Sequence, residues 1–80
     1  MFYIVEHDMG VHQIIDTTGK ANKYGKAKLF NTVGDAVKWL SRHYRNSSYA
    51  VGNSMYGIGS DPFYEVKEAT LRELRWWKEV

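Results

Sequence analysis

The stretch from residue 31 to residue 44 constrains the fold most, because it combines a helix start with an apolar stripe as long as a helix. Thr32 is placed to accept a hydrogen bond from the backbone N–H of Asp35, whose charge suits the first turn of a helix. Apolar residues then recur at offsets of 3, 4, 7 and 11, the spacing of one helical face. They are Val33, Ala36, Val37, Leu40 and Tyr44. The pattern predicts a helix whose apolar side the rest of the chain must cover.

Short apolar segments on either side of this helix predict four strands. Residues 2–6 and 11–16 are rich in β-branched and aromatic side chains and are joined by a segment containing Asp and Gly, so we expect a hairpin. After the helix, residues 49–51 are apolar and residues 63–68 alternate in polarity, which indicates a third and a fourth strand. The strands would supply the surface that buries the helix.

Two glycine-containing segments and a second helix complete the chain. Residues 17–26 and 52–62 lack an apolar period and are predicted as loops, the first of them mobile. Thr70 and Glu73 have the spacing of a capping box, which predicts a helix over 71–78. The residues expected on the inner face of this helix are Leu71, Leu74, Trp77 and Val80.

The length and the aromatic content favour one small domain, residues 1–80. A chain of 80 residues is long enough for one core, and its three Trp, six Tyr and three Phe supply large side chains to fill it. The predicted order is ββαββα. We therefore expect an α+β fold, a two-layer sandwich of an antiparallel sheet with two helices on one face.

Composition and motifs exclude several classes of protein. Cysteine is absent, so neither a disulfide framework nor a zinc site with Cys ligands is available. No apolar run approaches the roughly 18 residues of a membrane span and no secretory leader is recognisable, so we expect a soluble, cytoplasmic protein that binds no membrane. A hairpin would bring His7 near His12, beside Asp8, but two histidines without a third ligand of clear spacing do not predict a metal site. No catalytic constellation and no cofactor motif is present, so we expect no enzyme.

The pair Trp76-Trp77 is the first candidate for a functional surface. Neighbouring helix positions point about 100° apart, so both indoles cannot face the same core. An exposed Trp near arginines has the composition of a protein-binding hot spot, and the alternative is that both rings cover the sheet. The expected partner-binding residues are Trp76, Trp77, Arg72, Arg75, Tyr56 and Ile58, the last two from the glycine-rich loop.

A basic central segment is the second candidate. Residues 17–46 hold seven basic residues and one acid, a net charge of +6, whereas the rest of the chain holds four basic residues and eight acids, −4, which together give +2. The basic residues are Lys20, Lys23, Lys26, Lys28, Lys38, Arg42 and Arg45. With aromatic residues nearby, this segment suits an RNA- or DNA-binding module, and the alternative is a solvated helix face and loop.

A compact, aromatic-rich chain with Gly/Asn/Tyr loops and no enzyme motif resembles the small accessory proteins encoded by bacteriophages. The resemblance implies a non-catalytic interaction protein that binds a host or complex protein and inhibits it by occlusion. The basic centre differs from the acidic proteins that mimic DNA. A homodimer formed through an edge strand or an exposed indole is a further alternative.

Overall fold

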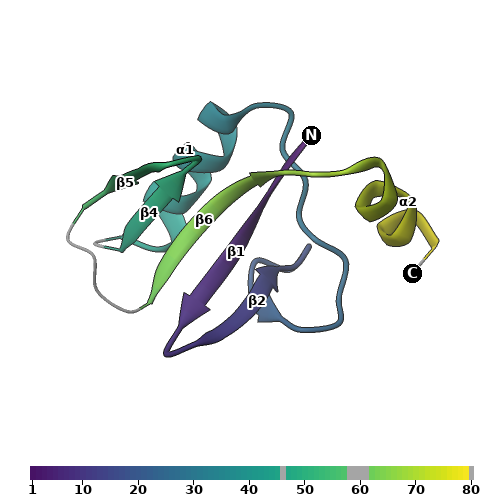
Figure 1. The fold of residues 1–80 in the computed structure, drawn as a ribbon, viewed down its shortest axis with the longest axis horizontal. Helices are drawn as coiled ribbons and strands as arrows, with labels where there is room; N and C mark the ends of the chain where they lie inside the picture. The colour runs from purple at the N-terminus through teal and green to yellow at the C-terminus, as the bar shows by residue number, and fades with distance from the viewer. Residues whose placement is uncertain (46, 58–61, 80) are drawn as a thin grey trace.

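The chain folds into one six-stranded mixed sheet with two helices, seen in a computed structural model that describes residues 1–45, 47–57 and 62–79 (Figure 1). The elements are β1 Phe2–Asp8, β2 Val11–Ile15, β3 Ala21–Asn22, α1 Val33–His43, β4 Ser48–Val51, β5 Ser54–Tyr56, β6 Phe63–Glu68 and α2 Leu71–Glu79. Across the sheet the strands lie in the order β3-β2-β1-β6-β4-β5. The α+β class is confirmed.

The predicted N-terminal hairpin is confirmed, with a tighter turn than expected. β1 and β2 pair antiparallel, with Val5 opposite Ile14. Met9 and Gly10 form the whole turn, and both have positive φ, 50° and 84°. Two such residues are typical of the two-residue turn whose twist matches the flanking strands. The segment predicted as the first loop contains β3, which pairs with the end of β2.

The prediction of an antiparallel sheet is wrong at one pair of strands, because β4 and β6 run parallel. The segment 52–62 was expected to join them as a single loop. Residues 54–56 instead form β5, which pairs antiparallel with β4 at the outer edge of the sheet. The chain therefore reverses once more before β6, which then enters between β4 and β1.

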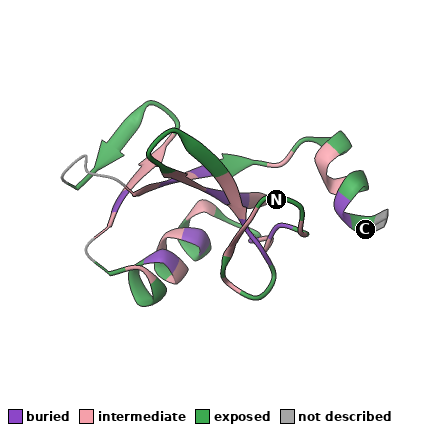
Figure 2. Cartoon of the chain, turned by 90° about the horizontal axis from the view of Figure 1, so that it is seen from below, coloured by how far each residue is buried: buried purple, intermediate pink, exposed green. Residues whose placement is uncertain are grey.

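The first predicted helix is confirmed, and it covers one face of the sheet. Its N-cap is Thr32, whose hydroxyl accepts from the N–H of Asp35 at 3.1 Å. Ala36 and Leu40 are buried and belong to the core beneath the helix. The strand residues of this core are Ile4 and Ile15 of the first hairpin and Tyr64 and Val66 of β6. Figure 2 shows the buried residues of α1 turned toward the sheet and its outer side exposed.

The prediction that both helices share one face is wrong. The buried residue of α2, Trp77, packs with Tyr3 and Val5 of β1. These alternate along the strand with Ile4, which faces α1, so their side chains lie on the opposite side of the sheet. In Figure 1, α2 lies beyond the end of β6 at one end of the molecule. Leu71, expected to be inward, is 81% exposed, and Val80 lies outside the described residues.

The capping box of α2 is confirmed and also attaches the helix to the sheet. The N–H of Thr70 donates to Glu73 Oε1 at 2.9 Å, and the N–H of Glu73 donates to the Thr70 hydroxyl at 3.1 Å. The hydroxyl of Tyr3 donates to the other carboxylate oxygen of Glu73 at 2.6 Å. Burial alone raises the pKa of Glu73, but these hydrogen bonds outweigh it and hold the pKa below its usual value. Glu73 thus faces the sheet as an ionised acceptor.

The loop after β2, expected to be mobile, is held by the carboxylate of Asp16. Its Oδ1 accepts from the N–H and hydroxyl of Thr18, at 2.9 and 2.5 Å, and from the N–H of Lys20 at 3.2 Å. Its Oδ2 accepts from the Asn22 amide at 3.1 Å. Hydrogen bonds from the Thr18 and Asn22 side chains, with those from the backbone, lower the pKa of Asp16 to about 2.

The substitution Asp16→Asn is expected to destabilise the protein in a pH-dependent way. The folded-state pKa lies below the ordinary value of 3.8, so the stabilisation is complete above that value and disappears as the pH falls toward about 2. In urea denaturation, the variant should unfold at a lower midpoint than the parent protein near neutral pH, and the difference should narrow in acid. A gap that stays constant over the whole pH range would contradict this role of the carboxylate.

Candidate functional site

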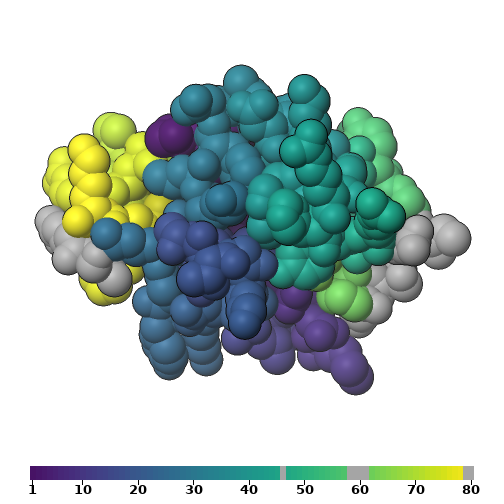
Figure 3. All heavy atoms as spheres, turned by 180° about the vertical axis from the view of Figure 1, so that it is seen from behind, coloured from purple at the N-terminus to yellow at the C-terminus, as the bar shows by residue number. Residues whose placement is uncertain are grey.

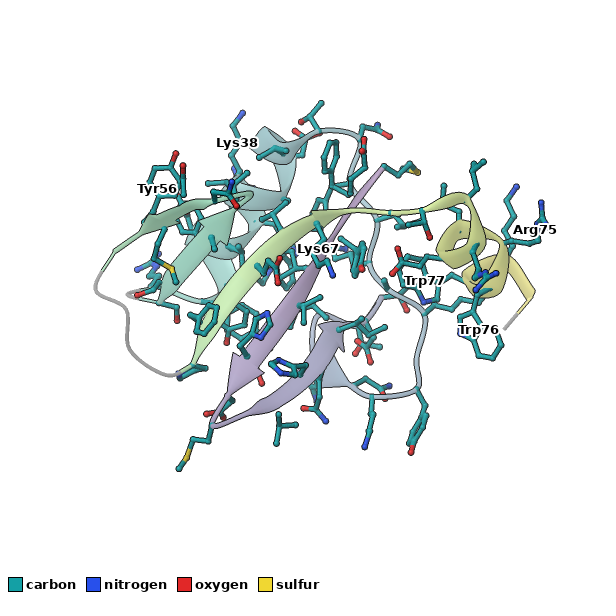
Figure 4. All side chains as sticks on the ribbon, in the orientation of Figure 1. Lys38, Tyr56, Lys67, Arg75, Trp76 and Trp77 are labelled. Atoms are coloured by element: carbon teal, nitrogen blue, oxygen red, sulfur yellow. The ribbon has the colours of Figure 1, made fainter. Side chains whose placement is uncertain are left out.

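The outward side of α2 presents an indole and two guanidinium groups to solvent. Trp76 is 61% exposed, whereas the adjacent Trp77 is 7% exposed. Arg72 and Arg75 are also exposed, and Arg72 lies one turn before Trp76 on the same helical stripe. Figure 4 shows Trp76 and Arg75 directed away from the sheet and Trp77 directed toward it. The expectation that the two indoles diverge is confirmed.

Trp77 holds this surface in place. Its ring meets the ring of Tyr3 edge to face, with centroids 4.9 Å apart. The same indole, with Leu74, forms one wall of a groove of about 550 Å³ whose other wall includes Ala27 and Leu29. The lysines that line the groove are Lys26 and Lys78. Trp77 therefore anchors α2 and lines an apolar groove edged by positive charge, while Trp76 remains exposed on the outward side of the helix.

Of the two loop residues expected to join this surface, the described one, Tyr56, does not. Tyr56, on the edge strand β5, is 49% exposed and stacks on Tyr49 with ring centroids 5.0 Å apart. It lies at the opposite end of the molecule from Trp76 (Figure 4). Ile58 lies outside the described residues. Of the six partner-binding residues predicted from the sequence, the four on α2 are grouped, and only three of those face solvent.

Lys26 of the basic segment lines the groove beside Trp77, whereas Lys28, Lys38 and Arg42 lie on the side of the molecule that carries α1. Figure 3 shows α1 and the segment that precedes it side by side on this face. The hydroxyl of Tyr44 donates to the Gly19 carbonyl at 2.6 Å, which ties the lysine-containing loop to the end of the helix. Lys20, Lys23, Lys26, Lys38, Arg42 and Arg45 are exposed, and Lys28 is half-buried.

Aromatic rings adjoin these basic residues. Trp39 stacks on His43 with centroids 4.4 Å apart, and the Lys28 ammonium lies 5.9 Å from the centroid of Trp39. A hollow of about 270 Å³ is lined by these two rings together with two cations, Lys38 and Arg42, and one acid, Asp35. This combination of a net positive charge with a half-buried indole and an exposed imidazole suits phosphate and base contacts.

A cluster of side chains on the face of the sheet opposite α1 was only partly predictable from the sequence. His7 lies opposite His12 across the hairpin, as the sequence spacing suggested, and Asp8 falls on the other face. Glu65 and Phe63 of β6 adjoin His7. Their approach depends on the pairing of β1 with β6, which is distant in sequence and left no local signal.

Comparisons of this chain with protein-family models, with curated proteins and with solved structures found no match. None of the helices in the described part of the chain is long and apolar enough to cross a membrane.

Proposed function

We propose that the protein is a non-catalytic interaction protein that binds an acidic surface of a protein partner through α2. It would act in the cytoplasm by occluding that surface, as the resemblance to phage accessory proteins implies. The observation that carries the proposal is the exposure of Trp76 next to a buried Trp77. An indole with no role in the core, on a helix that is fixed by its neighbour, is a preorganised anchor for a partner.

The charge on α2 favours an acidic partner. Glu73, the acid of its first turn, is turned toward Tyr3 and is used within the fold. The cations Arg72, Arg75 and Lys78 are exposed. Arginine and tryptophan are the residues most enriched where partners bind tightly, and complementary charge speeds the encounter. The groove along Trp77 offers an apolar recess for a side chain of the partner.

The substitution Trp76→Ala is expected to abolish capture of the partner without changing the fold. Truncating a hot-spot Trp costs at least about 2 kcal/mol, a roughly thirtyfold loss of affinity. The measurement is a pull-down from host lysate with the tagged protein, with and without nuclease, quantified by mass spectrometry. A defined protein should be retained in both arms and lost with Trp76→Ala.

The matched control is Tyr24→Ala, because Tyr24 is an exposed aromatic residue, at 82%, in the loop of the basic segment. It should retain the partner. Retention of the partner protein by the Trp76→Ala variant, or equal loss of the partner with both variants, would refute the proposed surface.

A second candidate function is binding of RNA or DNA through the basic segment. The observation that favours it is the hollow beside Trp39 and His43, which Lys38 and Arg42 edge. Binding of this kind falls steeply with salt, because each phosphate contact releases counterions. If the species captured in the pull-down from lysate were lost after nuclease treatment, the result would favour nucleic-acid binding over the first function.

A further inference from the structure

Two histidines on the face of the sheet opposite α1 have ring nitrogens that lie within hydrogen-bond distance of one another. His7 and His12 are direct partners in the β1–β2 register, and their Nδ1 atoms lie 2.5 Å apart. His12 is exposed, whereas the His7 side chain is 17% exposed. The pair lies on the face of the sheet opposite α1, away from the basic segment, because His7 alternates with Glu6, which contacts Tyr64 on the α1 side.

The state of His7 is set by Glu65. Its Nε2 lies 2.9 Å from Glu65 Oε1, and a carboxylate can only accept, so Nε2 carries the proton. The neutral ring then has its lone pair on Nδ1, the atom that faces His12. Phe63 stacks on the His7 ring, with centroids 4.6 Å apart and planes 8° apart, and restricts its rotation.

We propose that His7 and His12 form a two-ligand site for a borderline transition-metal ion, Zn²⁺ or Cu²⁺, bound through the two Nδ1 atoms. Without a metal, the Nδ1–H of His12 donates to the His7 lone pair. When His12 carries its proton on Nε2 instead, both Nδ1 atoms are acceptors and a cation can take the place of the shared proton. Imidazole is a preferred ligand of both ions. Histidine ligands commonly donate their other N–H to a carboxylate, which is the arrangement of His7 with Glu65.

The geometry requires only a small adjustment. Two nitrogens that bind Zn²⁺ tetrahedrally at 2.0–2.1 Å lie about 3.3 Å apart. The His12 ring would therefore move outward by under about 1 Å, and as an exposed side chain it has room to do so. Within residues 1–45, 47–57 and 62–79 no group of three or more His, Cys, Asp or Glu could hold a metal ion, so His7 and His12 would be the two protein ligands. The remaining positions would hold water, so the site is an open, exchangeable one.

The test is calorimetric titration of the tag-free protein with ZnCl₂ and with CuCl₂ in a non-chelating buffer. We expect saturable binding of one ion per chain, tighter for Cu²⁺ than for Zn²⁺, and no binding of Mg²⁺, which prefers oxygen ligands. His12→Ala should weaken binding at least about tenfold. Because His12 is exposed, this variant tests the site without risk to the fold.

The matched control is His43→Ala, since His43 is the only other histidine and lies on α1. It should leave the affinity unchanged. The absence of saturable binding at metal concentrations up to about 1 mM would overturn the proposal. Equal weakening by His43→Ala and His12→Ala would overturn it too.

Glu65 is assigned as a positioning residue. Glu65→Ala should weaken binding about tenfold or more and shift the His7 ring toward the other tautomer, which ¹⁵N NMR of the imidazole reports independently of affinity. An unchanged tautomer together with unchanged affinity would remove Glu65 from the site. This inference does not rest on the proposed function, because α2 contributes no ligand.

Discussion

Replacing Trp77 with alanine is expected to lower the free energy of unfolding by about 3–5 kcal/mol, the usual cost of truncating a buried Trp. The same change at Trp76 should cost less than about 0.5 kcal/mol, because a mostly exposed side chain leaves no cavity. The adjacent residues have the same chemistry and differ in exposure, 7% against 61%. For a domain of 80 residues, whose total stability is roughly 4–12 kcal/mol, the larger loss is a severe one.

Urea denaturation followed by circular dichroism measures both changes, and hydrogen exchange shows where they act. In Trp77→Ala, protection should fall first in α2, because the Trp77 indole is the one buried side chain described on that helix. Protection in β1 and β6 should fall less. Equal destabilisation by the two variants would mean that the indoles share one environment, and the separate roles of anchor and binding residue would be lost with it.

The features that the sequence predicts well are those coded within a few residues. The cap at Thr32 and the capping box at Thr70 depend on neighbours three positions away, and both form as expected. The stripe from Val33 to Tyr44 is also local, because helical periodicity alone defines it. The α+β class follows from such elements.

Two kinds of feature escaped prediction, a short edge strand without a strand pattern and contacts between strands that are distant in the sequence. Ser54, Met55 and Tyr56 form the outer strand of the sheet and all three are exposed, so no buried face imposes the alternation that marks a strand. Without β5, the chain has one reversal too few, and β4 is wrongly expected to run antiparallel to β6. The contact of His7 with Glu65 depends on the same long-range assembly and had no signal in either segment.

The orientation of α2 shows a limit of periodicity in a short helix. Leu71 and Trp77 were assigned to one face by steps of three residues. Two such steps leave the side chains about 120° apart, so both cannot be buried on one side. The larger side chain takes the contact with Tyr3, and Leu71 is left in solvent. The divergence of Trp76 and Trp77, which follows from the same angle, was predicted for the same reason.

The second large effect is expected at Ile4, which lies in the middle of the sheet and is fully buried. Ile4→Ala should lower the free energy of unfolding by about 2–5 kcal/mol, and Ile4→Val by about 0.5–1.5 kcal/mol, because the loss follows the number of buried methyl groups removed. Ile4 faces Val66 across the strands and α1 across the layers, so no mobile group is free to fill the cavity.

Urea denaturation measures the effect of the Ile4 substitutions, and we expect the m-value to stay unchanged, so that a shift of the midpoint reports stability. The control is Val11→Ala in the same hairpin, since Val11 is 53% exposed. The control should cost less than about 1 kcal/mol. If the free energy of unfolding stayed the same from Ile through Val to Ala at residue 4, the stabilising core would lie elsewhere. The graded series would instead show that the layer between β1 and α1 belongs to the stabilising core, to which the exposed Trp76, Arg72 and Arg75 of α2 contribute nothing and so remain available for binding.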